Sequence, residues 1–246
     1  MNSGFNLRNY LNVVAFIGNV LASYLIGARG VGSAESNEYL SLKYQTLVTP
    51  SSFAFAIWGI IFLAQAAFTV AQLLPNKRGT PIVQEGINDF YIGTCICQIV
   101  WSYSFGHEFI TLSFLAMVGI LVMLIKLVKS SHQIEVQEES TLDYFLFRFP
   151  FVIHLGWIIV ASVVNLNVLF VSWNAVGIVL TVLAVLSLVV ILSVATYATW
   201  WIKADLTIPL VLAWAMVRIF LVDCLQFGFK INCDKKFISP TYVCNN

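Results

Sequence analysis

One apolar stretch of the sequence, residues 148–170, carries side chains that could recognise a ligand. His154, Trp157, Ala161 and Asn165 stand at positions i, i+3, i+7 and i+11, so a helix would place them on one face. An indole ring can stack on a flat apolar molecule, while an imidazole and an amide can orient it by hydrogen bonds. The pattern predicts one wall of a binding cavity. Asn167 lies off this face and is expected to serve helix packing.

Three other apolar stretches pair tryptophan with polar or small groups in the same way. Polar side chains are costly in hydrocarbon, so these faces should turn toward the inside of a helical bundle. Together they predict a common cavity for a flat, apolar ligand with polar edges. For any single residue the alternative is a hydrogen bond between helices, worth about 0.6 kcal/mol. The residues are Trp58 with Gln65 and Gln72 at intervals of seven, then Gln98, Trp101 and Phe105, and finally Trp214 with Arg218.

Arg218 and His154 each carry two interpretations. Arg218 lies near the middle of the last apolar stretch, where a charge costs about 3 kcal/mol on insertion scales. It could pair with a ligand carboxylate or act as a structural hydrogen-bond donor, and Asp223, about 140° away round a helix, is a poor partner. His154 has no second His or Cys at ligand spacing on its own stretch, which favours a neutral, hydrogen-bonded imidazole over a metal ligand.

The sequence shows no set of residues that could carry a reaction. It holds no phosphate-binding glycine loop, no metal-binding histidine pair and no grouping of nucleophile, base and acid. We therefore predict no catalytic residues, no metal site and no required cofactor, and a binding protein rather than an enzyme.

The composition indicates that this chain lies mostly in lipid. Of its 246 residues, 59% are hydrophobic and 10% are charged, whereas charged residues make up about 25% of a soluble domain. The net charge of +1, without a dense basic cluster, argues against nucleic acid as a partner. We predict a multi-pass integral membrane protein forming a single domain over 1–246. Its expected partners are membrane lipid and an apolar small molecule. A homodimer is also compatible with the sequence.

The fold class follows from the length of the apolar stretches. A membrane-spanning helix needs about 20 mostly apolar residues, and lipid offers backbone groups no other partner, so an all-α transmembrane bundle is expected. Lys and Arg number seven on the N-terminal side and five on the other, which weakly favours the N-terminus inside and the C-terminus outside. The seven predicted helices cover 10–27, 51–74, 88–106, 109–129, 146–171, 175–202 and 206–229.

Both ends of the chain leave an alternative open. The first stretch could be a signal peptide, but Asn12 and Asn19 interrupt its apolar core, which favours a spanning helix. Cys233 and Cys244 flank residues of the polar tail 230–246. They could close a disulfide in an oxidising compartment or remain free thiols.

Three stretches in succession resemble motifs of the TspO/MBR family, the tryptophan-rich sensory proteins and translocator proteins. Residues 49–62, "TPSSFAFAIWGIIF", are similar to the family's second-helix signature. Residues 98–105, "QIVWSYSF", resemble Asn-x-x-Trp-x-x-x-Phe, with Gln98 in place of Asn. Residues 150–165 resemble Trp-x-x-x-Ala-x-x-x-Asn. The likeness covers 10–171, a five-helix core. The two further helices over 175–229, with "DLTIPLVLAWAM" at 205–216, look closer to a longer, seven-helix subgroup.

The resemblance implies a bundle that binds a tetrapyrrole or a sterol-like molecule, for sensing or transport, in a pocket closed by the loop 28–50. Trp58, Trp101 and Trp157 would stack on the ligand, while Gln98 and Asn165 would orient it. Ligand degradation has also been proposed for such proteins, which leaves the enzyme question open. Two other classes stay open as well. One is a small-solute transporter, although no inverted repeat is visible, and the other is a structural subunit of a larger membrane complex.

Overall fold

The computed structural model describes residues 7–134, 140–201 and 205–220. Within these residues the chain is helical and contains no strand, which confirms the predicted all-α bundle. Five helical segments are long and apolar enough to cross a membrane: Leu7–Ala28, Ser52–Ala71, Ile110–Gln133, Phe149–Ser172 and Gly177–Trp200. The predictions that concern Asp223 and the pair Cys233 and Cys244 fall outside the described residues.

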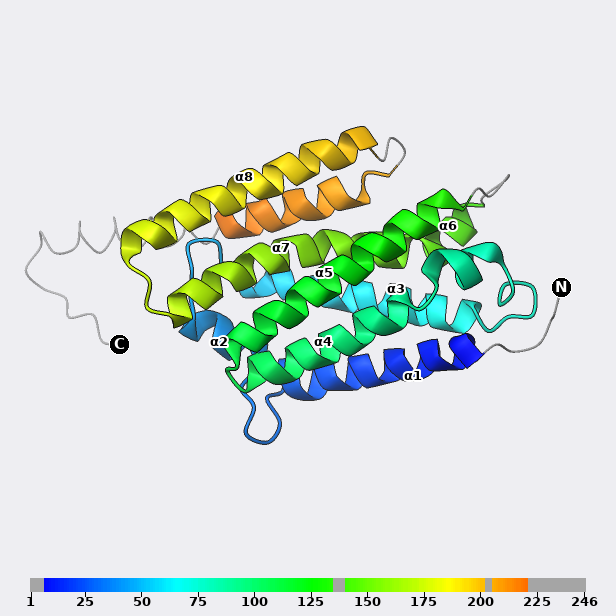
Figure 1. Cartoon of the computed structure of the whole chain (residues 1–246), viewed down its shortest axis with the longest axis horizontal. Helices are drawn as coiled ribbons and strands as arrows, with labels where there is room; N and C mark the ends of the chain where they lie inside the picture. The colour runs from blue at the N-terminus through cyan, green and yellow to red at the C-terminus, as the bar shows by residue number, and fades with distance from the viewer. Residues whose placement is uncertain (1–6, 135–139, 202–204, 221–246) are drawn as a thin grey trace, which may run out of the picture.

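The long helices run side by side along the length of the molecule (Figure 1). α1 lies at one side of the bundle, and α8 lies at the other with the helix that follows it (Figure 1). The elements in order are α1 (Leu7–Ala22), the π-helical η1 (Ser23–Ala28), α2 (Asn37–Lys43), the 3-10 turn η2 (Ser52–Ala56), α3 (Ile57–Ala71), the π-helical η3 (Ile82–Ile87), α4 (Phe90–Gly106), α5 (Ile110–Gln133), α6 (Thr141–Phe147), α7 (Phe149–Ser172) and α8 (Gly177–Trp201), followed by the helix Thr207–Phe220.

Two of the seven predicted spans appear as shorter helices. α4 has 17 residues, about 25 Å at 1.5 Å per residue, and it packs between α1 and α5 in the bundle. The last predicted span, 206–229, is described only as Thr207–Phe220.

Small residues bring the central helices close together. A Cβ added at Gly119 of α5 would lie 2.9 Å from the Cys97 Sγ of α4, and one added at Gly93 would lie 3.1 Å from the Met123 sulfur. Close backbone approach at small residues is how helices gain contact in lipid, where no hydrophobic force drives them together.

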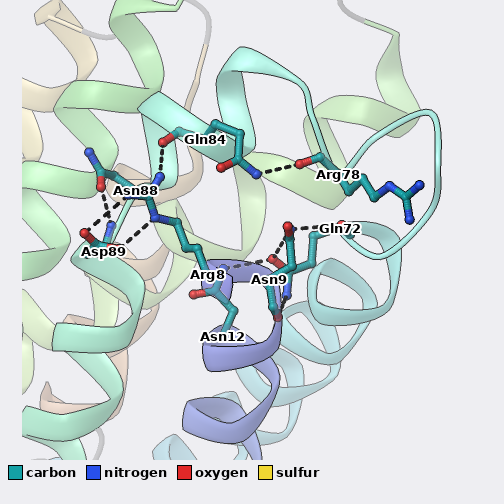
Figure 2. A network of polar contacts seen from close by, with 8 residues as sticks. All are labelled: Arg8, Asn9, Asn12, Gln72, Arg78, Gln84, Asn88 and Asp89. Atoms are coloured by element: carbon teal, nitrogen blue, oxygen red, sulfur yellow. Dashed lines mark hydrogen bonds and ion pairs between the residues drawn. The ribbon is translucent and has the colours of Figure 1, made fainter. Parts of the chain in front are cut away.

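A polar network fastens the start of α1 to the rest of the bundle (Figure 2). Asn12 donates to the Gln72 side-chain oxygen at 2.8 Å, and the Gln72 amide donates back to the Asn9 carbonyl at 3.1 Å. Arg8 forms an ion pair with Asp89 at 2.7 Å. Asn9, Asn12 and Gln72 are fully buried, so the polar residues that interrupt the first apolar stretch turn inward, as the cost of burying them in lipid requires.

The last described helix packs against α7. A Cβ added at Gly156 would lie 3.0 Å from the Val211 Cβ. The start of this helix is held by Asp205, which accepts from the Thr207 backbone N–H at 2.8 Å and from the Tyr144 hydroxyl at 2.7 Å. The glycine and the aspartate thus fix where the helix docks.

α8 is tied to α7 by a hydrogen bond within the membrane. Asn167 donates to the Ser187 hydroxyl at 2.8 Å. This is the packing role expected for a residue that lies off the Trp157 face.

Candidate ligand-binding site

A cavity with two adjoining lobes lies among α1, α2, α3, α4 and α7. The wide lobe has a volume of about 550 Å³ and the narrow lobe about 50 Å³. Asn37, Phe55, Trp58 and Trp101 line both lobes, so the two are parts of one site. The wide lobe opens toward η1 through residues such as Tyr24, while the narrow lobe reaches between α4, α5 and α7.

The structure brings together seven of the ten residues that the sequence predicted for the site. The wide lobe is lined by Trp58, Gln98 and Trp101. The narrow lobe is lined by Trp58, Trp101, Phe105, Trp157, Ala161 and Asn165. Their spacing on three separate helices therefore does place them round one space. Binding of a ligand there remains a prediction.

Aromatic rings form the frame of this cavity. The Trp101 and Phe105 rings are stacked, with centroids 5.3 Å apart and an interplanar angle of 11°. Trp157 meets Trp58 edge-on at 6.4 Å and Phe55 edge-on at 6.2 Å. Edge-to-face packing is favourable for these rings, so the contacts stabilise the frame. It presents both ring faces and ring edges to whatever occupies the space.

Several buried polar atoms round the cavity have no hydrogen-bond partner among the described residues. Two are donors, the indole N–H groups of Trp101 and Trp157, and two are acceptors, the Gln98 Oε1 and the Asn37 Oδ1. The other half of the Gln98 amide donates weakly to the Ser23 hydroxyl at 3.4 Å. The residues that line the cavity thus carry both donors and acceptors without a partner among the described residues.

Asn165 reaches its predicted position but is partly engaged. Its side-chain oxygen accepts from the Ser113 hydroxyl of α5 at 3.3 Å. This contact fixes the orientation of the amide, so Asn165 can present its N–H group to the narrow lobe.

Residues of the predicted loop 28–50 line the cavity, mainly through the short helix α2. Asn37, the first residue of α2, lines both lobes. The loop is fastened to the end of α4 by a hydrogen bond from the Glu35 backbone N–H to the Gly106 carbonyl at 2.8 Å.

Glu108, in the turn between α4 and α5, adds a second fastening for this loop. Lys43 donates to its carboxylate at 2.5 Å, and the Tyr44 hydroxyl donates at 2.6 Å. The hydrogen bond from Lys43, followed by that from Tyr44, lowers the pKa of Glu108. The same carboxylate raises the pKa of Lys43 and that of Tyr44. We call these three residues the latch.

His154 lies behind the cavity wall rather than on it. Its Nδ1 is 2.9 Å from the Gln65 Nε2, and its ring meets Trp58 edge-on at 5.6 Å. An amide nitrogen can only donate, so Nδ1 accepts and the imidazole proton lies on Nε2. His154 is thus a buried neutral residue that supports Trp58. Among the described residues, no group of three His, Cys, Asp or Glu could hold a metal ion.

Trp214 and Arg218 lie apart from the cavity, which corrects the prediction that all four faces meet. Trp214 lines a separate groove beside α3 and α7. The Arg218 guanidinium lies over the Trp214 ring at 4.1 Å and over the Phe53 ring at 4.4 Å. Phe53 belongs to η2, which precedes α3, so Arg218 lies level with an end of a spanning segment.

Phe55 and Asn37 are among the lining residues that sequence reasoning missed. Phe55 stands within the quoted stretch 49–62, and its ring contact with Trp157 could not be read from spacing across different helices. Asn37 lies in the stretch that the sequence predicts as a loop. Ser36 accepts from the Tyr39 backbone N–H at 3.2 Å and caps α2. The sequence signal for this short helix was a serine that can cap a helix N-terminus, followed by residues able to form a few helical turns.

Comparison with known proteins agrees with this architecture. A family model described as "TSPO-like protein" matches residues 9–225. The match runs through all three motifs and also through both helices beyond residue 171. Searches of curated proteins and of solved structures gave no significant match. With five apolar helices able to span a bilayer, the chain is an integral membrane protein, and it belongs to the TSPO-like protein family.

Proposed function

We propose that this protein binds a flat, apolar small molecule, a tetrapyrrole or a sterol-like compound, within the two-lobed cavity, for sensing or transport. The observation that carries the proposal is the aromatic cavity itself, in which buried indole N–H groups and amide oxygens lack partners among the described residues. Cavities of about 300–1,000 Å³ with mostly apolar walls and a few polar groups are typical small-molecule sites.

The buried polar atoms of the cavity would stabilise a bound ligand. A buried donor or acceptor without a partner costs about 1–3 kcal/mol. A ligand that satisfies the indole N–H groups of Trp101 and Trp157 and the oxygens of Gln98 and Asn37 removes that cost. The aromatic frame would meanwhile contact its apolar surface.

The number of unsatisfied polar atoms favours a tetrapyrrole that carries carboxyl groups. Carboxylates at its edge could accept from the indole N–H groups of Trp101 and Trp157, and a carboxyl group that keeps its proton could donate to Gln98 or Asn37. A sterol has a single hydroxyl group, which can donate to one oxygen and accept from an indole N–H, so it would satisfy fewer of these atoms. The proposed ligand therefore carries several polar groups on a flat apolar frame.

A porphyrin titration tests the proposal. Purified protein in detergent is titrated with protoporphyrin IX, and binding is read from the Soret band of the porphyrin, because removal of a tryptophan alters the fluorescence of the protein. Replacing Trp157 by Leu together with Asn165 by Ala should weaken binding at least tenfold, about 1.4 kcal/mol. Trp200→Leu is the control, since Trp200 is 85% exposed at the end of α8. Unchanged affinity in a double variant that still melts cooperatively would refute the proposal.

A further inference from the structure

A second apolar feature lies on the outer surface of the bundle, where the helix Thr207–Phe220 packs beside α3 and α7. It is a groove of about 370 Å³, separate from the two-lobed cavity. Its walls include Ile57 and Ile60 of α3, Ile153 of α7, and Leu210 of the last helix. From Thr207 to Trp214, which both line it, the groove follows the helix axis for about 10 Å.

Arg218 places a positive charge at one end of this groove. Its guanidinium is stacked on the rings of Trp214 and Phe53, at 4.1 Å and 4.4 Å, and both of these rings line the groove. Within residues 7–134, 140–201 and 205–220, no carboxylate forms a salt bridge with it. The Arg218 Nε and the Trp214 Nε1 are buried donors without an acceptor in that same part of the chain.

The position of this charge matches that of lipid head groups. Phe53 lies in η2, at the start of the spanning segment Ser52–Ala71, so the guanidinium lies near the membrane surface on the side of the loop 28–50. Stacking on two rings holds the planar guanidinium in place. Its N–H groups remain able to form the short, strong hydrogen bonds that arginine makes to phosphate oxygens.

We propose that the groove and Arg218 bind an anionic phospholipid. One acyl chain lies along the apolar walls, and the phosphate accepts hydrogen bonds from Arg218 and from the Trp214 indole N–H. The acyl chain of any lipid could lie in an apolar groove. Selectivity for an anionic head group must therefore come from the positive charge of Arg218. A basic side chain near the membrane surface is worth about 1 kcal/mol toward an anionic lipid.

Lipid retention in native mass spectrometry tests this. The detergent-solubilised protein is exposed to equal amounts of phosphatidylglycerol and phosphatidylcholine with matched acyl chains. The wild type should retain phosphatidylglycerol about fivefold more than phosphatidylcholine, which corresponds to about 1 kcal/mol. Arg218→Gln should abolish that preference. Arg218→Lys should keep part of it, because the charge remains while the planar donor set is lost.

Arg29→Gln is the matched control. Arg29 also lies over an aromatic ring, that of Tyr24 at 5.8 Å, but it lies in the loop and not beside the groove. It should leave the lipid preference unchanged. A wild type that retains both lipids equally would overturn the proposal, as would an equal loss of preference in the Arg29 and Arg218 variants. Porphyrin affinity should be unaffected by Arg218→Gln, so this test is independent of the two-lobed cavity.

Discussion

His154 of α7 and Gln65 of α3 face each other inside the bundle, with 2.9 Å between the imidazole Nδ1 and the amide Nε2. Both side chains are fully buried. The contact joins two helices that form walls of the cavity, and the imidazole also meets the edge of Trp58. The pair therefore stabilises the bundle and also supports Trp58 in the cavity wall.

Removing this contact should destabilise the protein. His154→Ala removes the acceptor of the Gln65 Nε2 and opens a cavity beside Trp58, so the free energy of unfolding should fall by about 2–4 kcal/mol. Thermal unfolding in detergent measures the effect. His132→Ala, which removes an exposed histidine from the last turn of α5, should stay within about 0.5 kcal/mol of wild type. Equal melting curves for the two variants would show that the buried contact does not stabilise the folded protein.

The latch should loosen at acid pH. The pKa of Glu108 is lowered in the folded protein, so its contribution is present above the ordinary carboxyl value of about 4.3 and is lost as pH falls through the folded pKa. The raised pKa of Lys43 acts in the opposite direction. Its contribution is complete below about 10.4 and is lost as pH rises through its own folded pKa.

Hydrogen exchange can detect this loosening. Protection factors of the Leu40 and Tyr44 amides, both bonded within α2, should be severalfold lower in Glu108→Gln than in wild type near neutral pH. The two proteins should converge at acid pH, where the wild-type carboxyl group is also uncharged. Glu35→Gln, which alters an exposed neighbour, is the control. A constant gap between wild type and Glu108→Gln at every pH would contradict the assignment.

Gly106 should tolerate no side chain. A Cβ there would lie 2.7 Å from the Ile26 Cγ2 and 3.3 Å from the Ala34 Cβ, so Gly106→Ala forces the loop 28–50 away from α4 and should cost about 1–3 kcal/mol. Gly59→Ala is the matched comparison, since no atom lies within 4 Å of a Cβ at Gly59. That change should be neutral or stabilising by up to about 1 kcal/mol. Melting temperatures that fall equally in both variants would rule out the steric explanation.

Docking of the last helix should depend on Gly156. A valine there would overlap the Val211 side chain, because even a Cβ at residue 156 would lie only 3.0 Å from the Val211 Cβ. Gly156→Val should therefore separate the helix Thr207–Phe220 from α7 and raise the rate at which a cysteine placed at Leu212, a fully buried position, reacts with a maleimide. The same cysteine in the wild-type background should stay unreactive. Equal labelling in both backgrounds would contradict the docking geometry.

Inward faces could be predicted from the sequence because lipid penalises exposed polar groups. Gln65 and Gln72, seven residues apart, are both fully buried, and Gln98 and Trp101 line the cavity. Each of these faces contrasts a polar group with apolar surroundings. Spacing then identifies the inward side of the helix.

α8 offered little such contrast. It is apolar on all sides, and in lipid an apolar face does not reveal whether it packs against protein or against acyl chains. The predicted depth of Arg218 was inferred from the middle of the apolar stretch 206–229, of which residues 221–229 lie outside the described part of the chain. The contact with Phe53 places the guanidinium level with one end of the segment Ser52–Ala71, and this contact joins residues far apart in the chain.

Filling the narrow lobe tests the central claim most directly. Ala161 lines this lobe, which has a volume of only about 50 Å³, so Ala161→Phe should occupy the space that a ligand would need. Ala213→Phe adds the same ring to an exposed position of the last helix. In a protoporphyrin IX titration, the Ala161 variant should bind at least tenfold more weakly than wild type, and the Ala213 variant should bind like wild type. Wild-type affinity in a stably folded Ala161→Phe protein would show that the ligand does not bind across the two lobes of this cavity.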